Sequence, residues 1–404
     1  MSGMVIVGGG QAGYSVSNKL RSMGFNGEIV IVCAENILPY QRPPLSKKFL
    51  MGDIPEERLF FRPADYYKKN NIMVKLGVKV TKIDRTSCKV YCSDGTILSY
   101  IKLFLVTGSE PNKFKETLGG NLAKNYYIRS AHDIRLVTPE FQFGKRVLII
   151  GGGYIGLEIA SIARKKNLDV ILVESQDRIL KRVACTQTAT FFKQLHEKNG
   201  VKVIEGRSIR MLVGKNGVFS GAILDNEEKI EADFCIIGIG IKPNTELARE
   251  SGLELENGVK VDDFCQTSDE NILAAGDCTN FPYGSARLRL ESVGNAIEQA
   301  EVAALTALDV KKKYEAKPWF WSDQYDVKLQ IAGLSFGYDQ IVERTDLLSS
   351  STWYFQRNKL IAVDAINDAK AFMVGKKLIE LGKSPEKKCI ANSALDLKFL
   401  LKSS

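Results

Sequence analysis

The chain has 404 residues, of which 45% are hydrophobic and 25% charged, and its formal net charge is +9. This is the composition of a globular protein, and the length predicts two or three domains that each bury a core. The sequence contains no long uncharged apolar stretch and no basic leader, so we expect no membrane span and no secretory signal, and we predict a cytoplasmic protein.

An internal repeat organises the chain. Residues 4–35 and 146–175 each begin with a short apolar run, continue through a glycine cluster and a helical stretch, and end in a second apolar run followed by an acid. Apolar, β-branched runs are typical of buried parallel strands. Strand–turn–helix–strand, written twice, predicts two Rossmann-type folds.

The segments around the second repeat predict further elements. Residues 39–44 are too proline-rich for a helix or an inner strand. We expect strands at residues 74–84, 89–92, 103–107, 232–240 and 271–275, a hairpin turn at 93–95, and a helix at 291–307. From Pro318 onward, aromatic strands and a closing helix at 368–381 predict a separate α+β domain.

Both glycine clusters fit the pattern G-x-G-x-x-G. The first runs from Gly8 through Gly10 to Gly13, and the second from Gly151 through Gly153 to Gly156. In this pattern the first glycine makes a tight turn, the second admits a pyrophosphate, and the third lets the helix pack closely on the strand. The pyrophosphate then rests on the N–H groups at the helix N-terminus. Two copies, each between a strand and a helix, predict two dinucleotide sites.

The acid that ends each repeat is the expected ligand of an adenosine ribose. Glu174 directly follows its strand, and a carboxylate there accepts both ribose hydroxyls and repels a 2′-phosphate, so we predict NADH in preference to NADPH. In the first repeat Glu35 is the expected ribose ligand, although it stands a position or so later than the pattern requires. A strand followed by Gly276-Asp277 after the second repeat predicts that the N-terminal fold takes FAD, with Asp277 on the ribityl hydroxyls.

Several motifs resemble one family from end to end. They are YQRPPLSK at 40–47, LVTG at 105–108, IIGGGYIGLEIA at 149–160, AAGDC at 274–278, RLESVGNAIEQA at 289–300 and PWFWSDQYD at 318–326. The chain is similar to NADH-dependent ferredoxin reductases of the putidaredoxin reductase and biphenyl-dioxygenase reductase group. Apoptosis-inducing factor and monodehydroascorbate reductase are more distant relatives.

The resemblance implies a glutathione-reductase-like α/β flavoprotein with two Rossmann-type domains and a C-terminal α+β domain. The FAD-binding domain would comprise residues 1–112 and 241–317, the NAD-binding domain 113–240, and the C-terminal domain 318–404. The implied catalytic pair is Lys47, beside the flavin, with Glu158 as its partner. Physically, an ammonium near the flavin stabilises its anionic reduced form, and a paired carboxylate compensates that charge.

The resemblance also implies the cofactor contacts. For FAD they are Gly8, Gly10, Ala12, Gly13, Glu35, Arg42, Lys47, Val80, Thr107, Gly108, Arg129, Gly276, Asp277, Val293 and Trp321. For NAD they are Gly151, Gly153, Tyr154, Ile155, Gly156, Glu158, Glu174, Gly238 and Gly240. One departure concerns Ala34, where family members usually have an acid. This departure leaves Glu35 as the remaining candidate for the flavin ribose contact.

The cysteines indicate where the electrons go. The eight cysteines include no C-x-x-C pair, and the segment 38–46 lacks the cysteine of related disulfide reductases, so we expect reduced thiols and no thiol relay. With two distant histidines and no paired cysteines, we expect no metal site.

Electrons would leave the flavin singly for an acidic 2Fe–2S ferredoxin, attracted by the basic chain, and reach an oxygenase indirectly. We expect neither nucleic acid nor membrane as a partner. The alternatives are reduction of rubredoxin or a small acceptor, or redox sensing in the manner of apoptosis-inducing factor.

Overall fold

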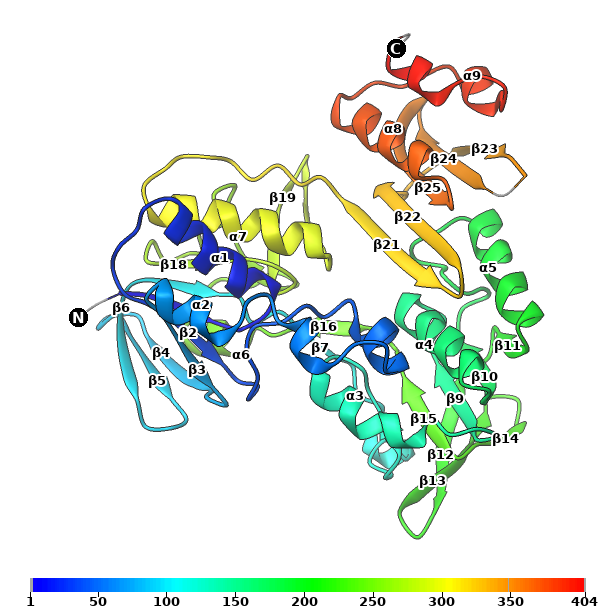
Figure 1. Ribbon diagram of the computed structural model, residues 1–404, viewed down its shortest axis with the longest axis horizontal. Coiled ribbons are helices and arrows are strands. Elements are labelled where there is room, and N and C mark those ends of the chain that lie inside the picture. Colours follow the sequence, from blue (N-terminus) through cyan, green and yellow to red (C-terminus); the bar gives the residue numbers. More distant parts are fainter. Residues whose placement is uncertain (1–2, 348, 403–404) are drawn as a thin grey trace. The chain divides into compact units, whose positions relative to one another are not determined.

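The computed structural model describes residues 3–347 and 349–402. The chain forms two compact units (Figure 1). Unit 1 comprises residues 1–42, 55–110 and 241–318, and unit 2 comprises residues 43–54, 111–240 and 319–404. Each unit contains one of the two repeats, so each contains one of the glycine clusters.

Unit 1 is built on a sheet with the strand order β3-β2-β1-β6-β5-β4, with β18 paired to β6. The strands are β1 (Gly3–Val7), β2 (Ile29–Cys33), β3 (Ile72–Leu76), β4 (Val80–Asp84), β5 (Lys89–Cys92), β6 (Ile97–Leu105) and β18 (Ile272–Ala274). Strands β1, β2, β3, β6 and β18 pair in parallel, and the parallel pairing of β1 with β2 is what the apolar runs of the first repeat predicted. Helix α1 (Gln11–Ser22) lies beside α7 (Val293–Ala307) in Figure 1, and the two helices pack together.

Shorter elements complete unit 1. They are α2 (Ala64–Lys69), α6 (Glu246–Glu250), the helical turn Glu56–Leu59 and a small sheet of β17 (Val259–Lys260), β19 (Thr279–Tyr283) and β20 (Ala286–Leu288). Strand β7 (Ser109–Pro111) pairs with β16 (Ile241–Pro243), and the chain leaves and re-enters unit 1 along these two strands.

Unit 2 contains a second parallel sheet with the order β11-β10-β9-β15-β8. Its strands are β8 (Asn125–Tyr126), β9 (Arg146–Ile150), β10 (Asp169–Glu174), β11 (Val201–Glu205) and β15 (Phe234–Ile237). The helices of this part are α3 (Ala131–Val137), α4 (Tyr154–Lys165) and α5 (Thr186–Lys198). A three-stranded antiparallel sheet, β12 (Ile209–Lys215), β13 (Val218–Leu224) and β14 (Lys229–Glu231), follows along the chain. The short helix η1 (Leu45–Phe49) also belongs to unit 2.

The C-terminal part of unit 2 is an antiparallel sheet with helices, as the aromatic strands predicted. Its strand order is β21-β22-β25-β24-β23. The strands are β21 (Trp319–Gln324), β22 (Val327–Gly333), β23 (Gln340–Thr345), β24 (Ser350–Gln356) and β25 (Lys359–Ile366), and the helices are α8 (Ala369–Glu380) and α9 (Lys387–Ala391). Trp353 and Phe355 of β24 are fully buried in the core between this sheet and α8.

One predicted strand is wrong. Residues 74–84 do not form one continuous strand but contribute to both β3 and β4, which are separated at Gly77. Gly77 has a φ of +68°, which breaks the extended backbone. The hairpin turn at 93–95 is confirmed, because β5 and β6 pair in antiparallel fashion on either side of it.

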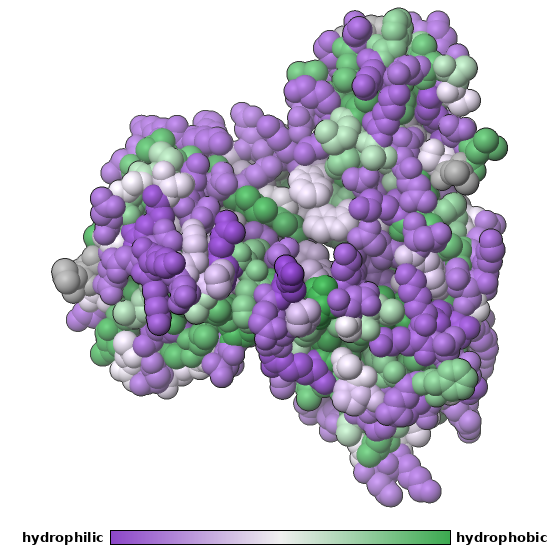
Figure 2. All heavy atoms as spheres, viewed as in Figure 1, coloured by the Kyte–Doolittle hydropathy of each residue, from purple (hydrophilic) through white to green (hydrophobic). Residues whose placement is uncertain are grey.

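The division of residues 113–240 from 318–404 stays a prediction, although each of these segments has its own sheet. Residues 43–54, assigned to the FAD-binding domain in the sequence analysis, cluster with unit 2. In the described part of the chain no helix is long and apolar enough to cross a membrane. On the face shown in Figure 2, hydrophilic side chains cover most of the surface, with apolar side chains scattered between them.

Candidate active site

The two glycine turns have matching geometry. Gly8 and Gly151, which open the turns, have φ values of +126° and +108°, a region that favours glycine. A Cβ atom on Gly13 would lie 2.0 Å from the carbonyl oxygen of Gly8, and one on Gly156 would lie 2.1 Å from that of Gly151. The third glycine of each cluster therefore allows the helix to approach the strand closely, as its place in the pattern predicts.

The helix N-termini behind these turns suit a pyrophosphate. The N-caps of α1 and α4 are Gly10 and Gly153, and neither helix has a side-chain cap or an acid in its first turn. The first N–H groups of both helices are therefore left for another acceptor, and the helix dipole favours an anion there. A Cβ on Gly10 or Gly153 would meet no protein atom within 4 Å, so the space in front of each turn is open. Both turns thus fit the phosphates of a dinucleotide.

Glu174 lies where a ribose ligand of the second turn is expected. Its Oε2 accepts a hydrogen bond from the backbone N–H of Gly152 at 2.7 Å, and its Oε1 accepts one from that of Gln176 at 2.8 Å. Oε1 also accepts from the Ser175 hydroxyl at 3.3 Å, so Oε2 is the oxygen that keeps a further lone pair for a hydroxyl donor. The carboxylate is therefore held against the glycine turn by the backbone and is oriented before any nucleotide arrives.

The corresponding place in unit 1 belongs to Cys33. Val7 pairs with Val32 as Ile150 pairs with Val173, so the next residue, Cys33, is the structural counterpart of Glu174. A Cβ on Gly9 would lie 2.3 Å from the Cys33 sulfur, which shows how closely this thiol faces the turn. Burial, and secondarily Glu35, raises the pKa of Cys33 to about 12. This thiol is therefore neutral at physiological pH and offers a ribose no carboxylate.

Glu35 is instead tied to neighbours in its own segment. Its carboxylate accepts hydrogen bonds from Arg42 at 2.7 Å and from the Tyr40 hydroxyl at 2.6 Å. Tyr40 and Arg42 both come from the YQRPPLSK motif, so this motif closes against the end of β2. The ribose contact of Glu35 stays a prediction. The register explains why the residue stands late in the pattern: it lies two positions beyond the counterpart of Glu174.

The Gly276-Asp277 turn is held by a buried polar network. Gly276 has a φ of +85°, and its N–H donates to Gln299 Oε1 at 2.8 Å. Ser109 donates to the Asp277 carboxylate at 2.8 Å. Thr107, in the LVTG motif, donates to the backbone oxygen of Asn244 at 2.7 Å. The predicted FAD contacts Thr107, Gly108, Gly276 and Asp277 therefore lie in loops fixed within unit 1.

The ion pair of Lys47 and Glu158 is confirmed. Lys47 Nζ lies 2.8 Å from Glu158 Oε1, and the Glu158 side chain is only 2% exposed. Ser46 also donates to this carboxylate at 2.5 Å, and Ser322 donates at 2.7 Å. Burial raises the pKa of Glu158, while Lys47 and the two hydroxyls oppose that rise. Glu158 is thus a buried carboxylate with three donors.

The other expected contact residues fall in both units. Ala12, Val80 and Val293 are in unit 1, on α1, β4 and α7, whereas Arg129, Tyr154, Ile155, Trp321, Gly238 and Gly240 are in unit 2. Gly238 flanks the second glycine turn, because its carbonyl oxygen lies 2.3 Å from the Cβ position of Gly151. The rings of Tyr154 and Phe320 pack in a tilted arrangement with centroids 4.4 Å apart, and Lys47 Nζ lies 6.0 Å from the centre of the Trp321 ring. The cofactor roles of all these residues stay predictions.

The sequence analysis missed two residues that complete the Glu158 site. Ser46 and Ser322 are neighbours of Lys47 and Trp321 in the motifs YQRPPLSK and PWFWSDQYD. Their hydroxyl side chains stand next to residues already predicted to lie at the site, and this was the sequence feature that could have pointed to them. They are separated from Glu158 by 112 and 164 residues, so periodicity contained no trace of the contact.

The thiols do not resemble a redox centre. All eight cysteines are free, and six of them are buried. Burial raises the pKa values of Cys92, Cys235, Cys265 and Cys278 above the ordinary range for a thiol. Because the thiolate is the reactive form, these residues are poor nucleophiles. Their environment agrees with packing roles.

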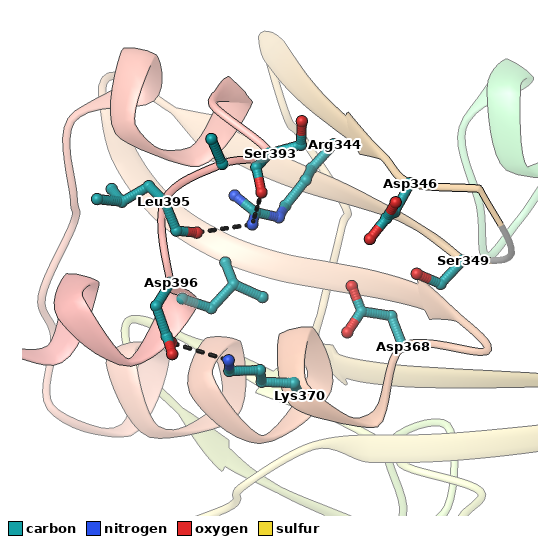
Figure 3. A pocket seen from close by; sticks show the side chains of 10 residues that line it. Arg344, Asp346, Ser349, Asp368, Lys370, Ser393, Leu395 and Asp396 are labelled. Carbon is teal, nitrogen blue, oxygen red and sulfur yellow. Dashed lines mark hydrogen bonds and ion pairs between the residues drawn. The ribbon is translucent and has the colours of Figure 1, made fainter.

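A polar pocket of about 280 Å³ lies in the C-terminal part of unit 2 (Figure 3). Its arginine, Arg344, donates to the backbone oxygens of Ile390, Asn392, Ser393 and Leu395. Its lysine, Lys370, pairs with Asp396 at 2.9 Å. The cationic groups of the pocket therefore fasten the C-terminal segment of the chain to β23 and α8.

Known proteins are similar to this chain over nearly its whole length. The family model for pyridine nucleotide-disulphide oxidoreductases matches residues 2–300, and the model for the reductase C-terminal domain matches residues 319–401. The chain belongs to the pyridine nucleotide-disulphide oxidoreductase family. Rhodocoxin reductase from Rhodococcus erythropolis is 38% identical over 98% of this chain and 94% of its own length. The expected resemblance to ferredoxin reductases is therefore confirmed.

Two solved structures are similar over nearly the whole chain. The covalent complex of putidaredoxin reductase with putidaredoxin matches with a TM-score of 0.95 and 35% identity, over 99% of this chain and 98% of that chain. The ferredoxin reductase for the CYP199A2 system from Rhodopseudomonas palustris matches with a TM-score of 0.96 and 33% identity, over 100% of both chains. The predicted fold class, an α/β flavoprotein with two Rossmann-type domains and a C-terminal domain, is confirmed. Members of the family are oxidoreductases that bind FAD and a nicotinamide dinucleotide, as the sequence predicted.

Proposed function

We propose that this chain is an NADH-dependent ferredoxin reductase that serves a cytochrome P-450 type monooxygenase or a ring-hydroxylating dioxygenase. The observation that carries the proposal is similarity over nearly the full length to reductases, one of them solved in complex with putidaredoxin. The acceptor we propose is an acidic 2Fe–2S ferredoxin. We place this activity in the cytoplasm, and the eight free thiols agree with a reducing compartment.

The residues of unit 2 would bind and orient NADH. The open N-terminus of α4 would hold the pyrophosphate, and Glu174 would accept the ribose hydroxyls. A 2′-phosphate would meet the Glu174 carboxylate at close range and would be repelled, which supports NADH over NADPH. Tyr154, packed against Phe320 at the start of α4, would border the nicotinamide end.

Bound FAD would supply the redox chemistry, which is reduction by a hydride from NADH and release of single electrons to the acceptor. The residues of unit 1 would hold it through the open N-terminus of α1 and the Asp277 carboxylate. Lys47 would provide positive charge to the flavin, and Glu158 would hold that ammonium in place. We propose no catalytic base, because hydride transfer depends on proximity and alignment.

Charge is the simplest reason for the choice of acceptor. The chain carries a net charge of +9, so an acidic partner is attracted at a distance, and salt screens that attraction. We expect the rate of ferredoxin reduction to fall as ionic strength rises. A rate that does not respond to salt would contradict electrostatic docking.

The deciding experiment is steady-state turnover with NADH and cytochrome c as the terminal acceptor. Fast reduction of cytochrome c only after a 2Fe–2S ferredoxin is added supports the proposal. Equal or faster turnover with rubredoxin or a small quinone in place of ferredoxin would favour the alternative acceptors. Slow turnover with every acceptor would favour a redox sensor.

A further inference from the structure

A line of hydrogen bonds runs from Glu158 into helix α5. Ser322 Oγ donates to Glu158 Oε1 at 2.7 Å, and Gln324 Nε2 donates to Ser322 Oγ at 3.2 Å. Gln324 Oε1 lies 2.8 Å from His196 Nε2, and the Tyr325 hydroxyl lies 3.4 Å from His196 Nδ1. We call Glu158, Ser322, Gln324 and His196 the glutamate–histidine chain. All four are buried within unit 2.

The carboxylate at one end sets the direction of the whole chain. An ionised carboxylate only accepts hydrogen bonds, so Ser322 must use its single hydroxyl proton to donate to Glu158. Ser322 is then an acceptor toward Gln324, which turns the amide nitrogen of Gln324 to Ser322 and the amide oxygen to His196. The ring nitrogen that faces this oxygen must be a donor, so the proton of His196 lies on Nε2.

The imidazole suits this one-way arrangement. His196 lies on the buried face of α5 with Thr188, Ala189 and Phe192, and burial lowers its pKa to about 4, although the bond to Gln324 opposes the fall. A neutral imidazole has one donor and one acceptor nitrogen. With the proton on Nε2, Nδ1 is left to accept from the Tyr325 hydroxyl, whose ring lies 5.2 Å from the imidazole.

We propose that Gln324 and His196 are positioning residues for the Lys47–Glu158 pair, because Gln324, held by His196, donates to Ser322 and offers no acceptor that competes with Glu158 for the Ser322 proton. Neither residue touches Lys47; they act through Ser322. If the side chain at position 324 could only accept, it would compete with Glu158 for the Ser322 proton and weaken one of the three donor contacts of Glu158. The inference rests on the proposed function only in that the Lys47–Glu158 pair serves the flavin.

The tautomer of His196 is a direct test. The chain has two histidines, His132 and His196, so nitrogen-15 NMR of histidine-labelled holoprotein gives a pair of ring-nitrogen signals for each imidazole, and a His132→Gln variant identifies the pair of the exposed His132. We expect His196 to be a single neutral tautomer with its proton on Nε2. A proton on Nδ1 would overturn the proposal.

A substitution at the far end of the chain tests whether Glu158 sets the direction. In the double variant Lys47→Met/Glu158→Gln the side chain at position 158 becomes both donor and acceptor. It also no longer faces the ammonium that shares Oε1 with Ser322, so Ser322 is no longer forced to donate to it. We expect a mixture of the two His196 tautomers in this variant. The same single Nε2 tautomer as in the unmodified protein would show that Glu158 does not set the direction, and the proposal would fail.

The functional readout is the rate at which NADH reduces the bound flavin, followed by stopped-flow absorbance. Gln324→Glu has nearly the same shape but only accepts hydrogen bonds, so it draws the Ser322 hydroxyl away from Glu158. We expect flavin reduction about tenfold slower at saturating NADH, the size of effect that follows from losing one hydrogen bond to a charged group. The control is Gln194→Glu, the same change at an exposed position of α5.

The outcomes separate this inference from the proposed function. An unchanged rate in Gln324→Glu would overturn the positioning role, even if the unmodified protein reduces ferredoxin. Failure of the unmodified protein to reduce ferredoxin would overturn the proposed function, whereas the His196 tautomer would still test the chain. If Gln324→Glu does not fold, the His196 tautomers of the unmodified protein and of Lys47→Met/Glu158→Gln decide the matter.

Discussion

The Lys47–Glu158 pair gives a sharp quantitative prediction. In Lys47→Met the Glu158 carboxylate keeps two hydroxyl donors but loses its counter-charge while it stays buried. Breaking a buried ion pair typically destabilises a protein by about 3–5 kcal/mol. Because Ser46 and Ser322 remain, we expect the lower end, about 3 kcal/mol of the free energy of unfolding. Glu158→Gln leaves Lys47, which is 18% exposed, with access to water, so we expect a loss of only about 1 kcal/mol.

The assay exploits the position of the tryptophans. Trp319, Trp321 and Trp353 are the three tryptophans of the chain and all lie in unit 2, so tryptophan fluorescence during urea unfolding reports on this unit. The double variant Lys47→Met/Glu158→Gln removes both charges, and we expect it to be more stable than Lys47→Met alone by about 1–2 kcal/mol. Lys48→Met, at an exposed neighbouring lysine, is the control. Losses for the two single changes that simply add in the double variant would refute the reasoning.

The pH dependence of Lys47→Met has a definite sign. The pKa of Glu158 is already raised by burial, and removal of Lys47 raises it further. The folded state then binds a proton more readily than the unfolded state, so stability is retained at low pH and falls as pH rises through the raised pKa. We expect the difference between Lys47→Met and the unmodified protein to shrink as the pH is lowered. A difference that grows toward low pH would contradict a buried, uncompensated carboxylate.

Three further predictions concern other residues. Glu174→Ala should lower the preference for NADH over NADPH about tenfold, because the change removes a repulsion of about 1.4 kcal/mol between the carboxylate and a 2′-phosphate. The preference is measured as the ratio of the kcat/KM values for the two nucleotides, and Gln176→Ala is the control. Gly156→Ala should abolish NADH binding while FAD stays bound, since the new Cβ would lie 2.1 Å from the Gly151 oxygen; nucleotide titration and the flavin spectrum show whether both effects occur together. Burial raises the pKa of Asp364 to about 7, so the stability of unit 2 should fall as pH rises from about 4 to about 7. Asp364→Asn should not show this fall. Urea unfolding midpoints of the variant and of the unmodified protein at about pH 5 and about pH 8 test the difference.

The sequence predicted the large-scale order of the chain because that order is written in local patterns. The strand–glycine–helix repeats appear as β1–α1–β2 and β9–α4–β10, with helix and strand bounds close to those expected. Residues 74–84 were misread because the alternation of side chains continues across Gly77, whereas the backbone turns there. Local sequence patterns therefore predict helices and strands well, but they predict the breaks between neighbouring strands poorly.

The site was predictable in part. The glycine turns and Glu174 follow from sequence spacing, and the Lys47–Glu158 pair came from a family resemblance, since 111 residues separate its members. The glutamate–histidine chain had no sequence signal of this kind. Its bond between His196 and Gln324 spans 128 residues, and His196 reads in sequence as one more member of the buried face of α5. Polar contacts between distant segments depend on tertiary packing, which periodicity does not encode.

The fastening of the C-terminal segment has a practical consequence for protein engineering. One way to join a reductase to its electron acceptor in a single polypeptide is to attach the acceptor behind the C-terminal segment. In this chain the segment before that end is anchored by the four backbone bonds of Arg344 and by the Lys370–Asp396 pair. A fusion that keeps residues 390–397 intact would attach the acceptor to a segment that is anchored to its domain. Deleting those residues to shorten the linker would instead remove the hydrogen-bond acceptors of Arg344 and destabilise the domain to which the acceptor is attached.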